Sequence, residues 1–227
     1  MSAPAIDIRE LEFRYRPALP PVLKISELSL NSGESCFLYG PSGCGKTTLL
    51  GLIAGVLTTR NGQINVLGEN LSTLSGARRD RFRGSQLGYI FQMFNLIPYL
   101  SVRENILLAC RLHKQRRERL KGESLEAAST RIAKALGIEA LLDRGVTELS
   151  VGQQQRVAAA RALLGAPPLI IADEPTSALD TAHREQFLKL LLDQAKLANS
   201  TVLFVSHDQS LAPLFDRRIS LPEVNRA

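Results

Sequence analysis

The first part of the chain alternates apolar and polar residues in the way that half-buried strands do. Ile6–Phe13 alternates clearly, Val22–Leu30 does so loosely, and Asn31–Glu34 has the composition of a turn. Shorter, mainly apolar runs follow at Cys36–Tyr39, Ile64–Leu67, Leu87–Phe91, Leu169–Ala172 and Val202–Val205. Apolar runs of this kind predict strands that are buried on both faces of a sheet.

Helical spacing of apolar residues separates these runs and fills the middle of the chain. It predicts helices at Thr47–Val56, Val102–Leu120, Ser124–Leu136, from Gly152 to Leu164, and Thr181–Leu197. Alternating strands and helices are typical of a parallel sheet with helices on both faces. The charged helical segments in the middle interrupt that alternation. The pattern therefore predicts an α/β nucleotide-binding core with a helical insertion.

The composition excludes several classes of protein. Of the 227 residues, 44% are hydrophobic and 22% are charged, which is close to the average composition of soluble globular domains. This composition excludes a disordered chain, a collagen-like repeat and a scaffold held together by disulfides. No apolar run approaches the roughly 18–20 residues of a membrane span, and Met1–Arg9 lacks a secretory signal. Cys36, Cys44 and Cys110 are an odd number of cysteines at unrelated spacings, which favours reduced thiols. We expect a soluble cytoplasmic protein.

The net charge of +6 permits an anionic partner but does not require one. Basic residues gather in two clusters, which are Arg78, Arg79, Arg81 and Arg83, and Arg111, Lys114, Arg116, Arg117, Arg119 and Lys121. Each cluster is either a solvated helical face or a docking or membrane-proximal surface. Because no aromatic residues are interleaved with these charges, stacking on single-stranded nucleic acid is not favoured.

A phosphate-binding loop is the strongest chemical signal in the sequence. Gly40-Pro41-Ser42-Gly43-Cys44-Gly45-Lys46-Thr47 matches G-x-x-x-x-G-K-[ST] and lies between a predicted strand and a predicted helix. The glycines allow successive backbone N–H groups to converge on a phosphate, and the positive end of the helix dipole adds to them. Lys46 would reach the β- and γ-phosphates, and the Thr47 hydroxyl would bind Mg²⁺. The alternative, a glycine-rich turn that only connects two elements, leaves the Lys-Thr pair unexplained.

Acidic residues end the apolar strand Leu169–Ala172. Asp173 and Glu174 are expected at the carboxyl edge of the sheet, where α/β proteins bind ligands. There Asp173 can hold Mg²⁺ and Glu174 can polarise the water that attacks the γ-phosphate. Taken alone, such a pair could equally cap a helix. Together with the phosphate loop, it favours catalysis.

Three further polar segments could belong to the same site. Gln92 and His207 each follow a strand-like run, although either could be a structural hydrogen-bonding residue. Ser150-Val151-Gly152-Gln153 opens a helix, and Ser150 could simply be its N-cap. The same helix start could instead bind a second phosphate. A chain with one phosphate loop and one such helix start would then need a second copy to complete each site.

Taken together, these segments resemble the nucleotide-binding subunit of ATP-binding cassette transporters over essentially the whole chain. Gly40–Thr47 is similar to the Walker A loop, Leu169–Glu174 to Walker B with its catalytic glutamate, and Leu149–Gln153 to the family signature. Gln92 resembles the Q-loop residue, Ser177–Asp180 the D-loop and His207 the switch histidine. Tyr15 lies where the family stacks an aromatic ring on adenine.

The resemblance implies roles for individual residues. Glu174, His207, Gln92 and Lys46 would be catalytic, and Thr47, Gln92 and Asp173 would bind Mg²⁺. ATP would be bound by Tyr15, Gly40, Pro41, Ser42, Gly43, Cys44, Gly45, Lys46, Thr47, Thr48, Ser150, Gly152, Gln153 and Asp180. The implied fold is a P-loop NTPase core, with a mostly parallel sheet, an N-terminal antiparallel β part and an inserted helical subdomain.

The resemblance also implies an arrangement of partners. Two subunits, expected to be identical, would pack head to tail around two ATP molecules and drive an integral membrane permease, with no nucleic acid involved. The chain would be cytoplasmic and peripheral on the inner face of the cell membrane. It would form a single domain, with residues 1–92 and 157–227 as the core and residues 93–156 as the helical subdomain.

The sequence departs from the family pattern at two positions. Val151 replaces the first of two signature glycines, so either this position needs no positive φ or closure of the dimer is weakened. Cys44 replaces a small hydroxyl residue in the phosphate loop. We expect alkylation of Cys44 to block ATP hydrolysis and ATP to protect against it.

Within the family, Leu71–Gln92 and Phe94–Pro98 resemble the lipoprotein-releasing and macrolide-efflux type of exporter ATPase, although Ser177–Asp180 is also common among importers. Two other functions remain open at this stage. One is a mechanical regulator that drives a membrane partner of cell-wall enzymes without moving a substrate. The other is a soluble cassette ATPase acting on ribosomes or DNA, which the lack of a second cassette, coiled coil or zinc insert disfavours. A metabolic P-loop kinase would not explain the signature helix or His207.

Overall fold

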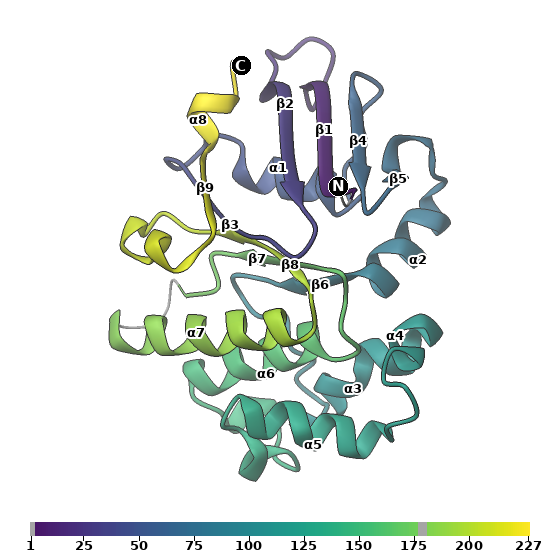
Figure 1. The fold of residues 1–227 in the computed structure, drawn as a ribbon, viewed down its shortest axis with the longest axis vertical. Coiled ribbons are helices and arrows are strands. Elements are labelled where there is room, and N and C mark those ends of the chain that lie inside the picture. The colour runs from purple at the N-terminus through teal and green to yellow at the C-terminus, as the bar shows by residue number, and fades with distance from the viewer. Residues whose placement is uncertain (1–2, 177–180) are drawn as a thin grey trace.

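Two sheets form one half of the molecule, and helix α1 (Lys46–Ile53) packs between them (Figure 1). The computed structural model describes residues 3–176 and 181–227. A group of helices forms the other half, below the larger sheet in Figure 1. The α/β class and the antiparallel N-terminal part expected from the sequence are confirmed.

The larger sheet is entirely parallel, with the strand order β6-β7-β8-β3-β9. Its strands are β3 (Ser35–Tyr39), β6 (Leu87–Ile90), β7 (Leu169–Asp173), β8 (Thr201–Val205) and β9 (Arg217–Ser220). Successive side chains along a strand point to opposite faces, and here both faces are covered. This explains why the strands are continuous apolar runs in the sequence.

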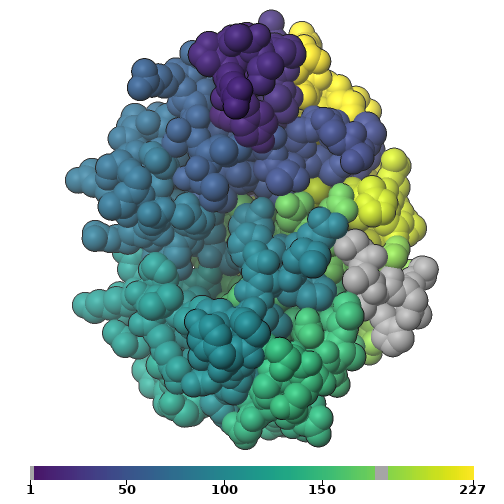
Figure 2. Space-filling view, turned by 180° about the vertical axis from the view of Figure 1, so that it is seen from behind, coloured from purple at the N-terminus to yellow at the C-terminus, as the bar shows by residue number. Residues whose placement is uncertain are grey.

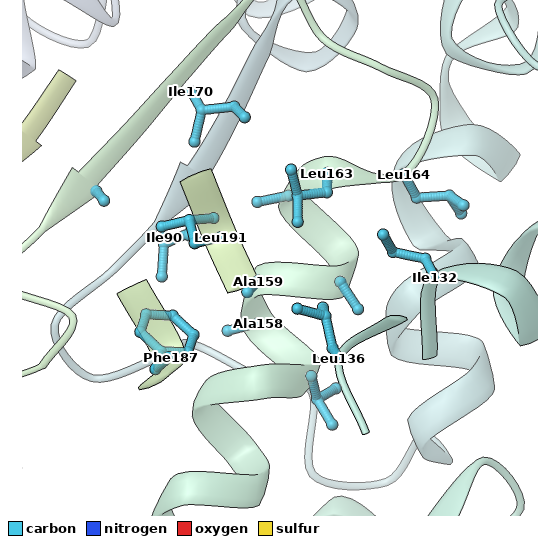
Figure 3. Close-up of a cluster of buried hydrophobic side chains, with 14 of the residues drawn as sticks. Ile90, Ile132, Leu136, Ala158, Ala159, Leu163, Leu164, Ile170, Phe187 and Leu191 are labelled. Atoms are coloured by element: carbon cyan, nitrogen blue, oxygen red, sulfur yellow. The ribbon is translucent and has the colours of Figure 1, made fainter. Parts of the chain in front are cut away.

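One face of this sheet packs against α6 and its neighbours. Figure 3 shows Ile90 and Ile170 from the sheet gathered with residues of α5, its C-cap, α6 and α7, namely Ile132, Leu136, Ala158, Ala159, Leu163, Phe187 and Leu191. The alternate residues of the same strands, such as Leu38 and Ile171, join the second core around α1. The parallel sheet is therefore held on both sides, and its carboxyl edge is fixed in position.

The smaller sheet is antiparallel, with the order β2-β1-β4-β5. It consists of β1 (Pro4–Phe13), β2 (Leu23–Asn31), β4 (Gln63–Val66) and β5 (Glu69–Asn70). Ile6 and Ile8 alternate with polar residues and are buried toward α1. The positive φ of Glu10 (46°) interrupts the alternation, so Leu11 is buried in the same core.

The remaining helices flank or follow the sheets. They are α2 (Gly76–Gln86), α3 (Val102–Leu112), α4 (Lys114–Glu118), α5 (Leu125–Ala135), α6 (Val151–Leu163), α7 (Thr181–Leu197) and α8 (Leu221–Val224). Single 3₁₀ turns occur at Leu71–Thr73, Glu139–Leu141 and Val146–Glu148, and a longer one at Gln209–Leu214. Among the described helices, none is both long enough and apolar enough to span a membrane.

The helix predicted over Val102–Leu120 is wrong in one respect, because it breaks in two at His113. This residue has an extended backbone (φ −123°, ψ 109°) between α3 and α4. Its imidazole lies against Gly84 of α2 so closely that a Cβ at Gly84 would clash with the ring. The contact between helices is not visible in the local spacing of apolar residues.

The second basic cluster is not a uniformly solvated face either. The side chain of Arg116 is only 2% exposed, and it is the largest of the fully buried side chains. Burial lowers its pKa to about 10, which still leaves it charged at neutral pH. Its guanidinium donates to the carbonyl oxygens of Ala162 (2.9 Å), Leu164 (2.6 Å) and Leu87. Arg116 thereby ties α4 to the end of α6 and to β6.

Candidate active site

Four neighbouring strands of the parallel sheet end beside one another, and each leads into a segment that was predicted to be functional. In the order β6-β7-β8-β3 these segments begin with Gln92, Asp173, His207 and the loop at Gly40–Thr47. The strands run parallel, so their carboxyl ends meet at one edge of the sheet. The structure thus brings together residues that are far apart in the sequence.

The loop Gly40–Thr47 joins β3 to α1 and needs glycine at two positions. Gly43 and Gly45 have φ values of +80° and +101°, a region that other residues rarely adopt. Gly45 is also the N-cap of α1, so the positive end of the helix dipole faces the loop. Lys46 is a buried residue, and its ammonium group donates to the carbonyl oxygens of Gly40 (2.7 Å) and Pro41 (3.0 Å). The loop therefore has the geometry of an anion-binding site, in which the Lys46 ammonium group is hydrogen-bonded to carbonyl oxygens of the loop itself.

Asp173 is the last residue of β7, and Glu174 follows it at the same edge. Burial raises the pKa of the Asp173 carboxyl, the negative charge of Glu174 raises it further, and the Lys46 ammonium opposes both. Glu174 has a positive φ of 44°, which is uncommon for a residue other than glycine. Its N–H donates to the Val205 carbonyl oxygen of β8 (2.9 Å), which holds this backbone in place. Strained backbone of this kind is often found at functional sites.

His207 contacts Glu174 directly. The His207 Nδ1 lies 3.3 Å from the Glu174 Oε2, and the side chain of His207 is 64% exposed whereas that of Glu174 is 21% exposed. The imidazole therefore stands at the open side of the carboxylate. A ligand that enters from solvent would meet both groups.

Seven of the fourteen residues predicted to bind ATP line one cavity of about 480 Å³, together with Gln92, Asp173 and Glu174, whereas Gly40, Pro41 and Cys44 do not line it. Its lining comprises Tyr15, Val22, Ser42, Gly43, Gly45, Lys46, Thr47, Thr48, Gln92, Asp173 and Glu174. The Tyr15 hydroxyl is hydrogen-bonded to the Thr48 hydroxyl (2.9 Å), and its ring remains 57% exposed, as a stacking surface for a base would be. Sequence analysis did not anticipate Val22, which carries no chemical signal.

The donor atoms of this cavity fit Mg²⁺. The hydroxyl of Thr47, the amide oxygen of Gln92 and the carboxylate of Asp173 are hard oxygen ligands of the kind that Mg²⁺ prefers. Over residues 3–176 and 181–227, no three His, Cys, Asp or Glu side chains cluster as a metal site. An ion here would therefore complete its shell with phosphate oxygens and water, as is usual for Mg²⁺ at nucleotides.

The helix start at Ser150 lies in a different place. Ser150 caps α6 in a reciprocal capping box with Gln153, since each side chain accepts from the other residue's N–H. Ser150, Gly152 and Gln153 line a separate hollow of about 270 Å³, not the cavity around Lys46. Val151 is the first residue of α6 and its φ is not positive, so the valine there needs no strained backbone. This resolves the first departure from the family pattern in favour of ordinary φ.

Asp180 and the rest of Ser177–Asp180 lie outside the described residues. Arg161, in contrast, is a residue that sequence analysis missed. From α6 it donates to the carbonyl oxygens of Asn95 and Phe94 (2.6 Å each), two consecutive residues with positive φ shortly after Gln92. A basic residue in the last turn of a helix was the available signal, but its partner could be known only from the fold.

The family of the chain follows from comparison with known proteins. The model of the family described as "ABC transporter" matches residues 23–177, a segment that contains the phosphate loop, Gln92, Ser150 and Glu174. The chain belongs to the ABC transporter family. The resemblance noted from the sequence is thereby confirmed.

Individual relatives cover the chain to different extents. The lipoprotein-releasing system ATP-binding protein LolD 2 of Rhodospirillum rubrum is 37% identical over 97% of this chain and 95% of its own length. The spermidine/putrescine import ATP-binding protein PotA of Legionella pneumophila (strain Paris) is 38% identical over 96% of this chain but only 57% of its own. This chain therefore matches almost the whole of the first relative and little more than half of the second.

A solved structure has the same fold. The dimeric structure of MJ0796, a bacterial ABC transporter cassette, superposes with a TM-score of 0.81 at 30% identity, over 95% of this chain and 93% of that one. The same cassette has also been solved in a post-hydrolysis state bound to ADP and Pi, with a TM-score of 0.79. The chain is accordingly an ATP-binding cassette and the ATPase subunit of a transporter.

Proposed function

We propose that this chain hydrolyses ATP at the carboxyl edge of its parallel sheet to power a lipoprotein-releasing type of exporter. The observation that carries the site assignment is the cavity that joins Lys46, Thr47, Gln92, Asp173 and Glu174. The similarity to LolD 2 over almost the full length of both chains supports the exporter type. The similarity to PotA extends over only part of that protein and supports the ATPase chemistry alone.

In the proposed site the phosphates of ATP lie on the loop Gly40–Thr47. The backbone N–H groups of the loop and the start of α1 contact the β- and γ-phosphates, and Tyr15 stacks on the adenine. Lys46 exchanges its two carbonyl acceptors in the loop for phosphate oxygens. Because those carbonyl contacts keep the ammonium beside the loop before ATP binds, the side chain has little distance to move.

In this proposal Mg²⁺ would be held by Thr47, Gln92 and Asp173. When bound, it neutralises charge on the β- and γ-phosphates. Glu174 orients a water molecule in line with the bond to the γ-phosphate and accepts its proton as the water oxygen attacks phosphorus. The bond between the γ-phosphorus and the bridging oxygen breaks, and ADP keeps that oxygen. His207, next to Glu174, donates to the γ-phosphate.

A second copy of the chain completes each site. Ser150, Gly152 and Gln153 line a hollow of their own, so one chain has the phosphate loop in one place and the signature in another. Head-to-tail pairing places the signature of each copy on the ATP of the other, and Asp180 is assigned to the same interface. The dimeric state of the MJ0796 cassette supports this arrangement.

The membrane permease is proposed to dock on a groove between the core and the helical insertion. We assign residues 1–92 and 157–227 to the core and residues 93–156 to the helical subdomain. The groove has a volume of about 620 Å³, and its apolar lining includes Val56, Leu57, Phe91, Leu108 and Leu112. Met93, which follows Gln92, is 82% exposed. Docking here places the chain on the cytoplasmic face of the cell membrane and links the permease to Gln92.

The proposal is tested by Glu174→Gln. We expect ATP hydrolysis to fall by about 10²–10⁴-fold, because the general base is lost, whereas a fluorescent ATP analogue still binds. The matched control is Glu118→Gln, which changes an exposed glutamate on α4. Hydrolysis at the wild-type rate in Glu174→Gln would show that the catalytic assignment is wrong.

The transporter type is tested by purifying the tagged chain from detergent-solubilised membranes. A multi-spanning protein with a large extracytoplasmic domain, present in stoichiometric amount, is the expected companion. Lipoprotein release in vesicles containing both proteins then separates transport from purely mechanical regulation. Ribosomal proteins or DNA in place of a membrane protein would overturn the exporter proposal and leave the ATPase assignment intact.

A further inference from the structure

The segment after β9 turns back over the phosphate loop. In Figure 1, α8 (Leu221–Val224) lies beside β2, and Figure 2 shows the yellow end of the chain next to the purple N-terminal residues. Pro222 covers the first residue of the loop, since a Cβ at Gly40 would lie only 3.0 Å from the Pro222 Cδ. None of the motifs described above includes this segment.

Asn225, which follows α8, uses its whole side-chain amide at this place. The Nδ2 donates to the carbonyl oxygens of Val22 (3.0 Å) and Cys44 (3.3 Å). The Oδ1 accepts from the N–H groups of Lys24 (2.7 Å) and Ala227 (3.3 Å). Two carbonyls need donors and two N–H groups need an acceptor, so only one orientation of the amide satisfies all four partners.

The bond to Cys44 fixes a peptide unit of the phosphate loop. In a trans peptide the C=O and the following N–H point in opposite directions. Holding the Cys44 carbonyl toward Asn225 therefore directs the Gly45 N–H away from Asn225. Gly45 lines the nucleotide cavity, and its N–H is one of the donors that a phosphate would use.

The bond to Val22 fixes a second segment that lines the same cavity. Val22 lines the cavity, and its carbonyl oxygen would lie 3.3 Å from a Cβ placed on Gly45. The side-chain amide of Asn225 thus links the backbone of Val22 to the backbone of the phosphate loop. The backbone pairing of Arg226 N–H with the Lys24 carbonyl oxygen (2.8 Å) anchors the amide to β2.

We propose that Asn225 is a positioning residue for ATP binding, which holds the Cys44–Gly45 peptide in the orientation that receives phosphate. This inference rests on the proposed nucleotide site. It predicts that loss of the two N–H donors weakens ATP binding and leaves the chemical step nearly unchanged, because Asn225 does not touch Glu174 or His207.

The test compares Asn225→Ala, Asn225→Asp and Arg226→Ala. Asn225→Asp keeps an acceptor for Lys24 but places an oxygen against the Val22 and Cys44 carbonyls, whereas Arg226→Ala changes an exposed side chain and keeps the backbone pairing. For both Asn225 variants we expect KM for ATP and Kd for a fluorescent ATP analogue to rise about 3- to 10-fold, as for the loss of one or two hydrogen bonds. We expect kcat within about twofold of wild type, and Arg226→Ala to match wild type throughout.

Cys44 supplies a local readout of loop order. Cys36 and Cys110 are buried, whereas Cys44 is partly exposed, so alkylation by N-ethylmaleimide without nucleotide reports on the loop. We expect Cys44 to react faster in both Asn225 variants than in wild type or Arg226→Ala, at an unchanged Tm.

Two results would overturn the proposal. The first is a KM for ATP and an alkylation rate that equal the wild-type values in both Asn225 variants. The second is a lower Tm and a lower kcat at unchanged KM, which would indicate a general structural role. Lys46→Ala is measured in the same binding assay. If Lys46→Ala also binds ATP normally, the nucleotide site itself is wrongly placed, whereas its failure to bind alongside normal Asn225 variants rejects only the present inference.

Discussion

At the scale of single residues, the site combines opposite charges that are kept from water. Asp173 and Lys46 lie in one cavity, and the burial of Asp173 outweighs the attraction of the ammonium, so that its pKa is raised. A carboxylate that is costly to ionise is a poor contributor to stability but a strong ligand for a cation. The burial of Asp173 therefore lowers the stability of the folded chain and suits the Mg²⁺ site proposed above.

Asp173→Asn tests whether the ionised Asp173 carboxylate lowers the stability of the folded chain while it is needed for ATP hydrolysis. Because the folded pKa is raised above the ordinary value near 3.9, the folded state binds more protons than the unfolded state between these two values. Wild-type stability consequently falls as the pH rises through that window, and the loss is complete above it. We expect Asp173→Asn to have a higher Tm than wild type at pH 7 and no ATPase activity.

The difference in Tm should shrink as the pH is lowered and disappear below about pH 3, where the carboxyl is protonated in both states. Thermal unfolding without nucleotide or metal, followed by circular dichroism at several pH values, is the measurement. The control is Asp143→Asn, since the side chain of Asp143 is 86% exposed. A variant less stable than wild type at pH 7 would contradict the prediction.

At the scale of elements, arginines that cap backbone carbonyls hold the helical insertion to the core. Arg161 binds the backbone after Gln92 from α6, and Arg116 joins α4 to the ends of α6 and β6. The last carbonyls of a helix have no partner within it. A buried guanidinium satisfies several of them at once, and its charge suits the negative end of the helix dipole.

Arg116→Met should lower the free energy of unfolding by about 2–4 kcal/mol, because buried carbonyls lose their donors. Arg117→Met is the matched control, since the Arg117 side chain is exposed on the same helix, and a change within about 0.5 kcal/mol is expected there. Urea unfolding measures both. Equal effects in the two variants would show that the buried hydrogen bonds of Arg116 do not stabilise the fold.

At the scale of the whole molecule, the two halves of the proposed site face different hollows. The phosphate loop lies in the cavity with Lys46, and Gly152 lines the other. We therefore expect nucleotide binding and closure of the proposed dimer to be separable in this chain. A substitution in the second hollow should leave the first intact.

Gly152→Asp in the Glu174→Gln background should still bind a fluorescent ATP analogue with wild-type affinity, because the nucleotide cavity is unchanged. It should fail to form the ATP-dependent dimer that Glu174→Gln alone forms, because a carboxylate at the signature repels the γ-phosphate of the opposite copy. Size-exclusion chromatography with light scattering measures the dimer. Lys46→Ala in the same background should lose both nucleotide binding and formation of the ATP-dependent dimer. Loss of nucleotide affinity in Gly152→Asp equal to that in Lys46→Ala would contradict the two-hollow arrangement.

Local patterns in the sequence determined most of the elements and the identity of the chemical groups. Continuous apolar runs predicted β3, β6, β7 and β8, because a strand covered on both faces needs no polar side. The spacing of glycines, Lys46 and Thr47 identified the phosphate loop, because its geometry depends on backbone torsions that only certain residues allow. α2, β9 and α8 were not predicted, since α2 has few apolar residues and the other two are short.

Which of these groups lie close together depends on how distant segments of the chain pack. The order β6-β7-β8-β3 brings Gln92, Asp173 and His207 to one edge, and pairing of strands over long sequence separations is not encoded in any local pattern. The buried position of Arg116, the break at His113 and the contact of Asn225 with the phosphate loop depend in the same way on the packing of distant segments. The sequence identifies the chemical groups, because they are side chains of particular residue types. The distances between these groups depend on the fold of the whole chain.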